Sequence, residues 1–315
     1  MIMKMLCFHI HSSDTMKYSS LIDEGEYDYE LHAFYHLDEC YNIVKGYKNI
    51  DSNMWRNMIH WLIETHWRLQ TLSQQTLFLC VNILQRFLSI TNHILDFNKD
   101  KKKFQLVVLT SLMLASKYEE EESPLCVYDL EYMTEFSCSI QEICEMELVI
   151  LQNLDWVLTL PTPYVFIHMN MRVSLESHDE DKIMEKMVFF ISELGLTHYS
   201  IVGFHKPSLI AASAVYAARI VLGKTPYWNK ILKNYTGYSK NKLDCCTKLM
   251  LQLCISYHRE GHNHVLKEFS SVICVVLQHF SNRSDLRTLM NKSLGQQNLI
   301  MNSNVGHRNR GLFGC

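Results

Sequence analysis

The sequence predicts an all-α protein built from two helical bundles. Gly and Pro are scarce, with 11 and 5 among 315 residues, and few stretches alternate with period two, so helices should dominate. Two segments, 103–118 and 206–222, are apolar on every side, and such a helix must lie at the centre of a bundle. A chain of this length also has a prior of two domains, each able to bury a core. We therefore expect two bundles of about five helices, each with a buried third helix.

The N-terminal half begins with a segment, residues 1–50, that contains one plausible amphipathic helix around Tyr27–Tyr41. The first bundle should span residues 51–160. In its second helix, apolar residues recur at the spacing of one helix face. Its central helix leaves the bundle at Ser116–Glu119, where a cation and a carboxylate follow a wholly apolar run. Helices are expected at 54–69, 75–90, 103–118, 125–135 and 140–155.

The second bundle, residues 161–280, should follow a break in the helical pattern. The stretch Leu158–Pro163 contains two prolines, which favour extended backbone and stop a helix. The third helix of this bundle is rich in Ala, so its neighbours can approach closely. From Ser281 onward apolar periodicity fades into a polar, Asn-rich tail, 281–315, that we expect to be disordered. Helices are expected at 163–172, 180–194, 206–222, 226–235 and 239–258.

Composition argues against several classes of protein. The formal net charge is −3, whereas a nucleic-acid binder normally has a basic bias. The chain has no run of 18 uncharged apolar residues, so no membrane span is expected. The 11 Cys are scattered through apolar helical stretches, as Cys80, Cys144 and Cys254 show. That pattern is typical of reduced, buried thiols in an intracellular protein.

No pattern predicts an enzyme, a cofactor or a metal site. The Gly-rich loops that bind phosphate, the nucleophile elbow and the zincin helix are all missing. Cys254, His258 and His262 share one helical face, but zinc needs four converging ligands, so we expect no metal there. The basic run at 99–103 is interpreted as a solvated loop before the central helix, with a nuclear-import signal as the alternative.

Several blocks of sequence resemble one known family. The runs MWRNMIHWLIETHWRL, TLFLCVNILQRFLS, LASKYEE and MELVILQNLDW occur in the order and spacing of the cyclin box. That order is similar to mitotic B-type cyclins, and the later runs ELGLTHYSIV and PSLIAASAVYAAR resemble the plant branch. The resemblance covers about residues 26–260 and implies a tandem cyclin fold.

The resemblance also implies a function. Such a protein is a regulatory subunit, not an enzyme, that binds and activates a cyclin-dependent serine/threonine protein kinase at the transition from G2 to mitosis, in nucleus and cytoplasm. An alternative is a degenerate cyclin-fold interaction protein that no longer activates a kinase. A cyclin-fold transcription factor that binds nucleic acid is disfavoured by the mildly acidic balance of charge.

Three residues match the kinase-binding positions of the family. Lys117 and Glu147 correspond to the two charged residues with which cyclins hold the kinase. For an isolated Lys at a helix end, a solvated side chain would be the simpler interpretation, but Lys117 follows a wholly apolar run inside a matching motif. Trp156 matches an aromatic contact of the family, and a plain core Trp is an equal alternative.

The family also carries a shallow apolar groove that binds Arg-x-Leu motifs of kinase substrates or inhibitors. Asn57 stands where the family has an aliphatic residue, and burial of one such side chain is worth about 1.5–3 kcal/mol. We therefore expect weakened or altered recognition of that motif. The matching positions are Met54, Asn57, Met58, Trp61, Glu64 and Gln105.

Two further features depart from the family. Trp55 and Gln85 stand where the family pairs an Arg with an Asp. Removal of one partner of a buried ion pair costs about 3–5 kcal/mol, yet replacement of both can be nearly neutral. Arg56, one residue along, is an alternative partner if the helix register slips. The 50 residues before the box contain no Arg, so the Arg-x-x-Leu destruction motif of mitotic cyclins is not expected there.

Overall fold

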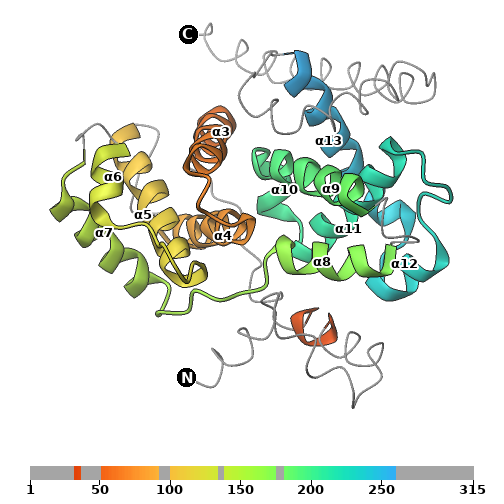
Figure 1. Cartoon of the computed structure of the whole chain (residues 1–315), viewed down its shortest axis with the longest axis horizontal. Coiled ribbons are helices and arrows are strands. Elements are labelled where there is room, and N and C mark those ends of the chain that lie inside the picture. The colour runs from red at the N-terminus through yellow and green to blue at the C-terminus, as the bar shows by residue number, and fades with distance from the viewer. Residues whose placement is uncertain (1–31, 37–50, 92–99, 134–137, 175–180, 260–315) are drawn as a thin grey trace, which may run out of the picture.

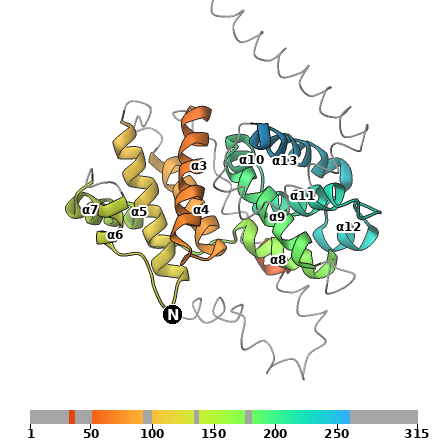
Figure 2. The same cartoon turned by 45° about the horizontal axis from the view of Figure 1, so that its top comes forward.

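The computed structural model describes residues 32–36, 51–91, 100–133, 138–174 and 181–259. Within these ranges every regular element is a helix, and the helices form two groups that lie side by side in both views (Figures 1 and 2). The predicted all-α class with two bundles is confirmed. None of the described helices is long and apolar enough to cross a membrane.

The first bundle is arranged around a buried central helix. Helix α5 packs against α3, α4, α6 and α7, and its side chains from Leu106 to Ser116 are all buried. Thr110, Ser111 and Ser116 are polar; the Thr110 and Ser111 hydroxyls donate to carbonyls one turn earlier, so burial leaves neither of these two donors unsatisfied. The bounds are α3 (Ser52–Leu69), α4 (Gln74–Thr91), α5 (Lys101–Glu119), α6 (Val127–Met133) and α7 (Ile140–Asn153).

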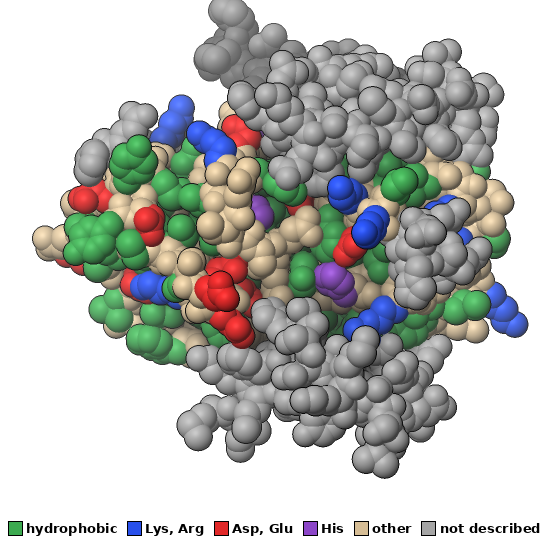
Figure 3. Space-filling model, in the orientation of Figure 1, with side chains coloured by type: hydrophobic (Ala, Val, Ile, Leu, Met, Phe, Trp, Pro, Cys, Tyr) green, Lys and Arg blue, Asp and Glu red, His purple; other side chains and the backbone are tan. Residues whose placement is uncertain are grey.

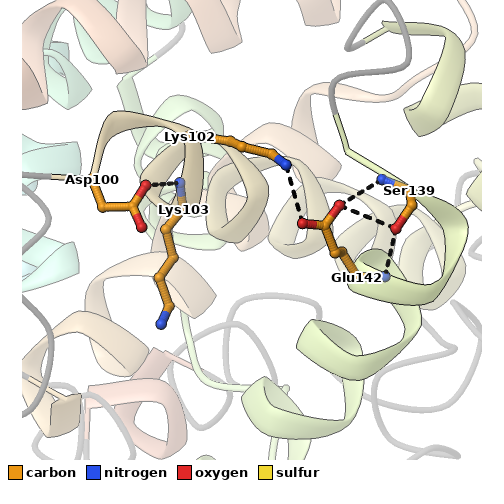
Figure 4. Close-up of polar contacts among 5 residues, drawn as sticks. All are labelled: Asp100, Lys102, Lys103, Ser139 and Glu142. Carbon is orange, nitrogen blue, oxygen red and sulfur yellow. Dashed lines mark hydrogen bonds and ion pairs between the residues drawn. The ribbon is translucent and has the colours of Figure 1, made fainter.

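Side chains fix where α5 and α7 begin, as Figure 4 shows. Asp100 accepts a hydrogen bond from the Lys103 backbone N–H, and Ser139 and Glu142 form a reciprocal capping box at α7. Lys102 then reaches Glu142, with 3.1 Å between Nζ and Oε1. The basic run therefore does not stay a loop, because Lys101–Lys103 form the first turn of α5.

The second bundle has a buried central helix of its own, α11. It packs against α8, α9 and α13, and its Ala-rich side chains are nearly all buried. Its one buried cation, Arg219, donates to the carbonyls of Ser174, Pro226 and Tyr227 at 2.9–3.2 Å, which ties the end of α8 to the loop after α11. The bounds are α8 (Pro163–Ser174), α9 (Asp181–Leu196), α10 (Tyr199–Phe204), α11 (Pro207–Val221), α12 (Lys230–Thr236) and α13 (Lys240–Arg259).

Two features of the second bundle differ from expectation. The short helix α10 was not predicted, and it fits between α9 and α11 where only a connection was expected. The helix predicted at 226–235 begins at Lys230 instead, because Asn229 caps it by accepting from the Leu232 N–H at 2.7 Å. As predicted, backbone around residues 158–162 is not helical, and α8 begins at Pro163.

The N-terminal segment touches the second bundle through one helical turn. His32 and Tyr35 are buried there, and both rings pack against Phe166 of α8. This turn falls inside the helix predicted around Tyr27–Tyr41. The rest of that prediction, and the tail 281–315, lie outside the described residues.

Side chains of the first bundle donate hydrogen bonds to α9. The Trp55 indole donates to the Leu196 carbonyl at 3.0 Å. The Trp67 indole and the Gln74 amide each donate to one oxygen of Glu193 at 3.2 Å. Burial raises the pKa of Glu193 to about 8 despite both donors. These contacts set α3 and α4 against the second bundle.

The described cysteines are free thiols. Cys80 and Cys254 are buried, as the sequence predicted. The same prediction was wrong for Cys144, which is exposed on α7. Its neighbours Ile143 and Met146 take the buried face of that helix.

Candidate protein-interaction surface

The structure brings Lys117 and Glu147 together across two helices. Lys117 lies in the last turn of α5 and Glu147 in the middle of α7, and Nζ lies 2.7 Å from Oε1. The two side chains are 41% and 21% exposed. An ion pair this open to water contributes at most about 1 kcal/mol to stability. Its stabilising effect on the fold is therefore too small to explain its placement.

The turn after α5 holds Lys117 in position. Ser116 is buried, and its hydroxyl accepts a hydrogen bond from the Leu125 backbone N–H at 2.8 Å, so the loop folds back over the helix end. Glu120 accepts from the Ser73 N–H at 2.7 Å and from the Thr76 hydroxyl, which fixes the same turn to the start of α4. The acidic run after α5 is thus partly structural, and burial raises the pKa of Glu119 to about 7.

Exposed apolar side chains occur on α7, which carries Glu147, and on α6, which packs against α7. Leu148 and Val149 follow Glu147 directly and are 47% and 40% exposed. Tyr128 and Tyr132 of α6 are more exposed still. Figure 3 shows apolar side chains emerging at this outer end of the first bundle, over α6 and α7. An ion pair with apolar neighbours is the composition expected of a protein-binding surface. We call Lys117, Glu147, Leu148, Val149 and Trp156 the charged face.

Trp156 is 64% exposed, so within the described structure it is not a core residue. The end of α7 explains why. The Asp155 N–H donates to the Gln152 carbonyl and the Trp156 N–H to the Leu151 carbonyl, the pair of hydrogen bonds of a Schellman motif. Asp155 and Trp156 both take left-handed backbone, with φ of 51° and 60°. This turn directs Trp156 away from the bundle just beyond the end of α7, the helix that carries Glu147.

The positions matched to the docking groove lie mainly on one face of α3. Met54, Met58 and Trp61 recur at helical spacing, are half-buried, and pack against the core. Asn57 is exposed beside them, and Glu64 is half-buried one turn beyond Trp61. Gln105 is half-buried on α5, which packs against α3. We call Met54, Met58, Trp61 and Glu64 the docking stripe.

Trp55 and Gln85, the two residues expected to replace an ion pair of the family, differ in their hydrogen bonding. Trp55 is wholly buried and makes the hydrogen bond to Leu196 already described, so it serves the contact between bundles. Gln85 is buried too, and its amide nitrogen has no hydrogen-bond partner in the described part of the chain. The helix register does not slip, because Trp55 and not Arg56 faces the core. Arg56 therefore does not replace the missing cation.

No group of three or more metal-binding side chains converges within the described ranges. Of the residues considered for a metal, Cys254 is buried, and burial raises the pKa of its thiol to about 12. A thiol held in its neutral form is a poor metal ligand. His262 lies outside the described residues.

Comparison with known proteins identifies the family. The model of the cyclin N-terminal domain matches residues 29–159, and that of the cyclin C-terminal domain matches residues 161–280. The chain belongs to the cyclin family. This cyclin is 40% identical to Cyclin-B1-2 of Arabidopsis thaliana over 242 residues, which cover 73% of this chain and 52% of the relative. It is 38% identical to Cyclin-B1-3 of the same plant, over 80% and 61% of the two chains.

Other relatives agree with the B-type assignment. G2/mitotic-specific cyclin-2 of Antirrhinum majus is 35% identical, over 73% of this chain and 53% of that one. The resemblance to plant B-type cyclins is confirmed, although this cyclin spans only about half to three-fifths of the relatives it matches. A crystal structure of a viral cyclin from herpesvirus saimiri shares the fold, with a TM-score of 0.59 at 16% identity over 71% of this chain and 97% of that one.

Sequence reasoning missed part of the charged face. Lys117, Glu147 and Trp156 were singled out, but Leu148 and Val149 were not, because one apolar residue on a helix is hard to tell from another. Their signal lies in the spacing. Ile143, Met146 and Ile150 take the buried face of α7, so Leu148 and Val149 fall outside that face.

Proposed function

We propose that this cyclin is a regulatory subunit that binds a cyclin-dependent kinase through the charged face and activates it for entry into mitosis, in nucleus and cytoplasm. The observation that supports the proposal is the partly exposed Lys117–Glu147 pair at 2.7 Å, together with the exposed apolar side chains of Leu148, Val149 and Trp156 on α7 and at its end. The names of the relatives, B-type and G2/mitotic-specific cyclins, point the same way.

The arrangement suits a partner helix. Lys117 offers donors for backbone carbonyls and Glu147 offers acceptor oxygens for the N–H groups left open at a helix N-terminus, so the two can hold the start of a partner helix and the chain that leads into it. The neighbouring apolar side chains can bury the rest of that helix. Protein kinases need a Lys–Glu pair whose Glu lies on a movable helix, and a subunit that holds this helix in place completes the pair.

We propose no catalytic activity for this cyclin alone. The kinase would supply the nucleotide site and the catalytic groups, and the cyclin would supply only the surface that orders them. Any phosphorylation by the complex should therefore vanish when the kinase is inactivated. Phosphorylation by the purified cyclin alone would contradict this.

Lys117→Ala and Glu147→Ala test the proposal directly. Loss of one member of a desolvated charge pair costs about 2–5 kcal/mol of binding, or roughly 30- to 4,000-fold in affinity. Each variant should lose binding to a recombinant cyclin-dependent kinase, measured by calorimetry, together with activation of histone phosphorylation. Helicity and melting should stay unchanged, because the pair contributes little to the fold.

The chain offers a matched control. Lys102 and Glu142 form a second Lys–Glu pair between the same two helices, at the opposite end of α5 (Figure 4). Lys102→Ala should therefore leave kinase affinity unchanged. Equal loss for Lys102→Ala and Lys117→Ala would mean that total charge, and not this surface, governs binding. If the unchanged chain binds and activates no kinase, the protein is a cyclin-fold interaction protein without that function.

A further inference from the structure

The docking stripe presents apolar surface next to a carboxylate. Met54, Met58 and Trp61 are half-buried along one face of α3, so part of each side chain meets solvent. Glu64 continues the stripe by one turn, and its carboxylate has no ion-pair partner among the described residues. A ligand that complements this surface needs a cation followed closely by large apolar side chains.

The chain itself contains such a segment. Its last residues read His-Arg-Asn-Arg310-Gly-Leu312-Phe313-Gly-Cys, outside the described ranges. Arg310 precedes two large apolar side chains, and glycines on both sides of the Leu–Phe pair let the backbone approach a surface closely. The tail from Ser281 is otherwise polar and Asn-rich, and its longer apolar run, Leu299–Met301, has no Lys or Arg within five residues, so it lacks the order of cation then apolar pair. A second run, Arg287-Thr-Leu289-Met290, has the same order but no aromatic ring.

We propose that the chain's own segment Arg310–Phe313 occupies the docking stripe, with Arg310 at Glu64 and the Leu–Phe pair on Met58 and Trp61. This inference rests on the proposed cyclin function, whose family resemblance implies a docking groove at these positions, and it adds the regulation of that groove. The cyclin would mask the surface through which it recruits Arg-x-Leu ligands, and a substrate or inhibitor would have to displace the tail.

Chain length permits this contact. Fifty residues separate Arg259, the end of α13, from Arg310. Fully extended, they would span about 165–180 Å, whereas a bundle pair of this size has a radius of gyration of about 17 Å. The tail can therefore reach α3 from the end of α13 with much slack.

Tethering also offsets the weakness of the stripe. Exposed Asn57 removes apolar area, so a free ligand should bind poorly. A tethered segment can reach an effective concentration on the order of 1 mM. A segment that binds as a free peptide with a Kd of about 100 µM would then fill the stripe about nine-tenths of the time and weaken an external ligand about tenfold.

The test uses the full chain and a fluorescent synthetic peptide with the sequence of residues 307–314. Fluorescence anisotropy would compare the parent with the variant Arg310→Ala/Leu312→Ala/Phe313→Ala. The peptide should bind this variant about tenfold more tightly than the parent, because the stripe is free. The matched control, Arg287→Ala/Leu289→Ala, should bind like the parent. Asn57→Leu in the tail variant should tighten binding severalfold, and Glu64→Gln should weaken it.

Several outcomes would overturn the inference. Equal affinity for parent and tail variant would mean that the tail does not occupy the stripe. If only Arg287→Ala/Leu289→Ala raised the affinity for the peptide, the segment around Arg287 would be the one that occupies the docking stripe. A parent of doubled mass by light scattering, reduced to one chain in the tail variant, would place the segment on a second copy.

The kinase-binding assay keeps the two proposals separate. A chain that binds the kinase through Lys117 but never binds the peptide would contradict only the inference about the tail. Loss of kinase binding with retained peptide unmasking would contradict only the proposed kinase function.

Discussion

At the scale of single residues, Glu193 is the least expected group in the molecule. It is buried between the bundles, and each carboxyl oxygen accepts one hydrogen bond from the first bundle. Burial raises its pKa from 4.5 to about 8, so at neutral pH the folded chain holds a proton that the unfolded chain has released. A neutral carboxyl group is the form that this interface accommodates.

Glu193→Gln should remove a pH dependence of stability. Between about pH 4.5 and pH 8 the folded state binds one more proton than the unfolded state. The stability contributed by protonated Glu193 is therefore fully present below about pH 4.5 and is lost as the pH rises toward 8. The loss approaches about 1.4 kcal/mol per pH unit for one proton. In urea unfolding from pH 5 to 8, the parent should therefore lose stability more steeply than the variant, in which Gln74 can reverse its amide.

Glu185→Gln is the control for this experiment, because Glu185 is exposed on the same helix. It should keep the slope of the parent. The buried His66 and the half-buried His168, whose pKa values desolvation lowers, act in the opposite direction at acid pH, but they are common to both variants and cancel in the comparison. Identical slopes for Glu193→Gln and the parent would show that Glu193 is ionised in the folded chain.

At the scale of elements, α7 determines the geometry of the charged face. Its capping box fixes the first turn, Glu147 lies two turns later, and the left-handed turn at Asp155 ends the helix and directs Trp156 outward. A shift in where α7 begins would rotate all of these side chains together. The local chemistry at both ends of the helix therefore positions residues that bind a partner.

Ser139→Ala should destabilise the chain by about 1 kcal/mol, because it removes the acceptor for the Glu142 N–H. Chemical denaturation would measure the change. Ser52→Ala is a suitable control, since Ser52 begins α3 but Asp51 is its cap, and the stability should change by less than about 0.5 kcal/mol. Equal losses of stability in Ser139→Ala and Ser52→Ala would mean that the capping box adds no stability beyond that of an ordinary serine at the start of a helix.

Predictability also differs between elements. The central helices α5 and α11 could be located from sequence, since a helix that is apolar on all sides fits only the centre of a bundle. Helix α10 could not, because six residues carry too little periodicity. The role of Arg219 was equally hidden, as its acceptors include a carbonyl 45 residues away in sequence. Lys117 and Glu147 were found through family motifs, but their mutual contact across 30 residues required the packing of α5 on α7.

At the scale of the whole molecule, Trp55 connects the bundles. Its indole donates to the Leu196 carbonyl and packs edge-on against Tyr199. At this position the chain therefore makes a contact between its two bundles. The buried amide nitrogen of Gln85, by contrast, has no hydrogen-bond partner among the described residues.

Trp55→Phe should lower the free energy of unfolding by about 1–3 kcal/mol, because it leaves the buried Leu196 carbonyl without its donor. Urea unfolding followed by circular dichroism would measure this. Trp156→Phe makes the same chemical change at an exposed site and should have almost no effect on stability. A Trp55→Phe variant as stable as the parent would show that water replaces the indole at no cost.

The direction of the hydrogen bonds between the bundles limits how this chain can be recombined with its relatives. Trp55, Trp67 and Gln74 of the first bundle all donate, and α9 accepts through a main-chain carbonyl and the Glu193 carboxyl group. A chimera that crosses over at the proline-rich connection would keep donors from one parent and acceptors from the other. Such a chimera can keep these hydrogen bonds only if its first bundle again supplies N–H donors at the positions of Trp55, Trp67 and Gln74. The proline-rich connection therefore separates the two bundles in the sequence, but the stability of each bundle still depends on contacts with the other.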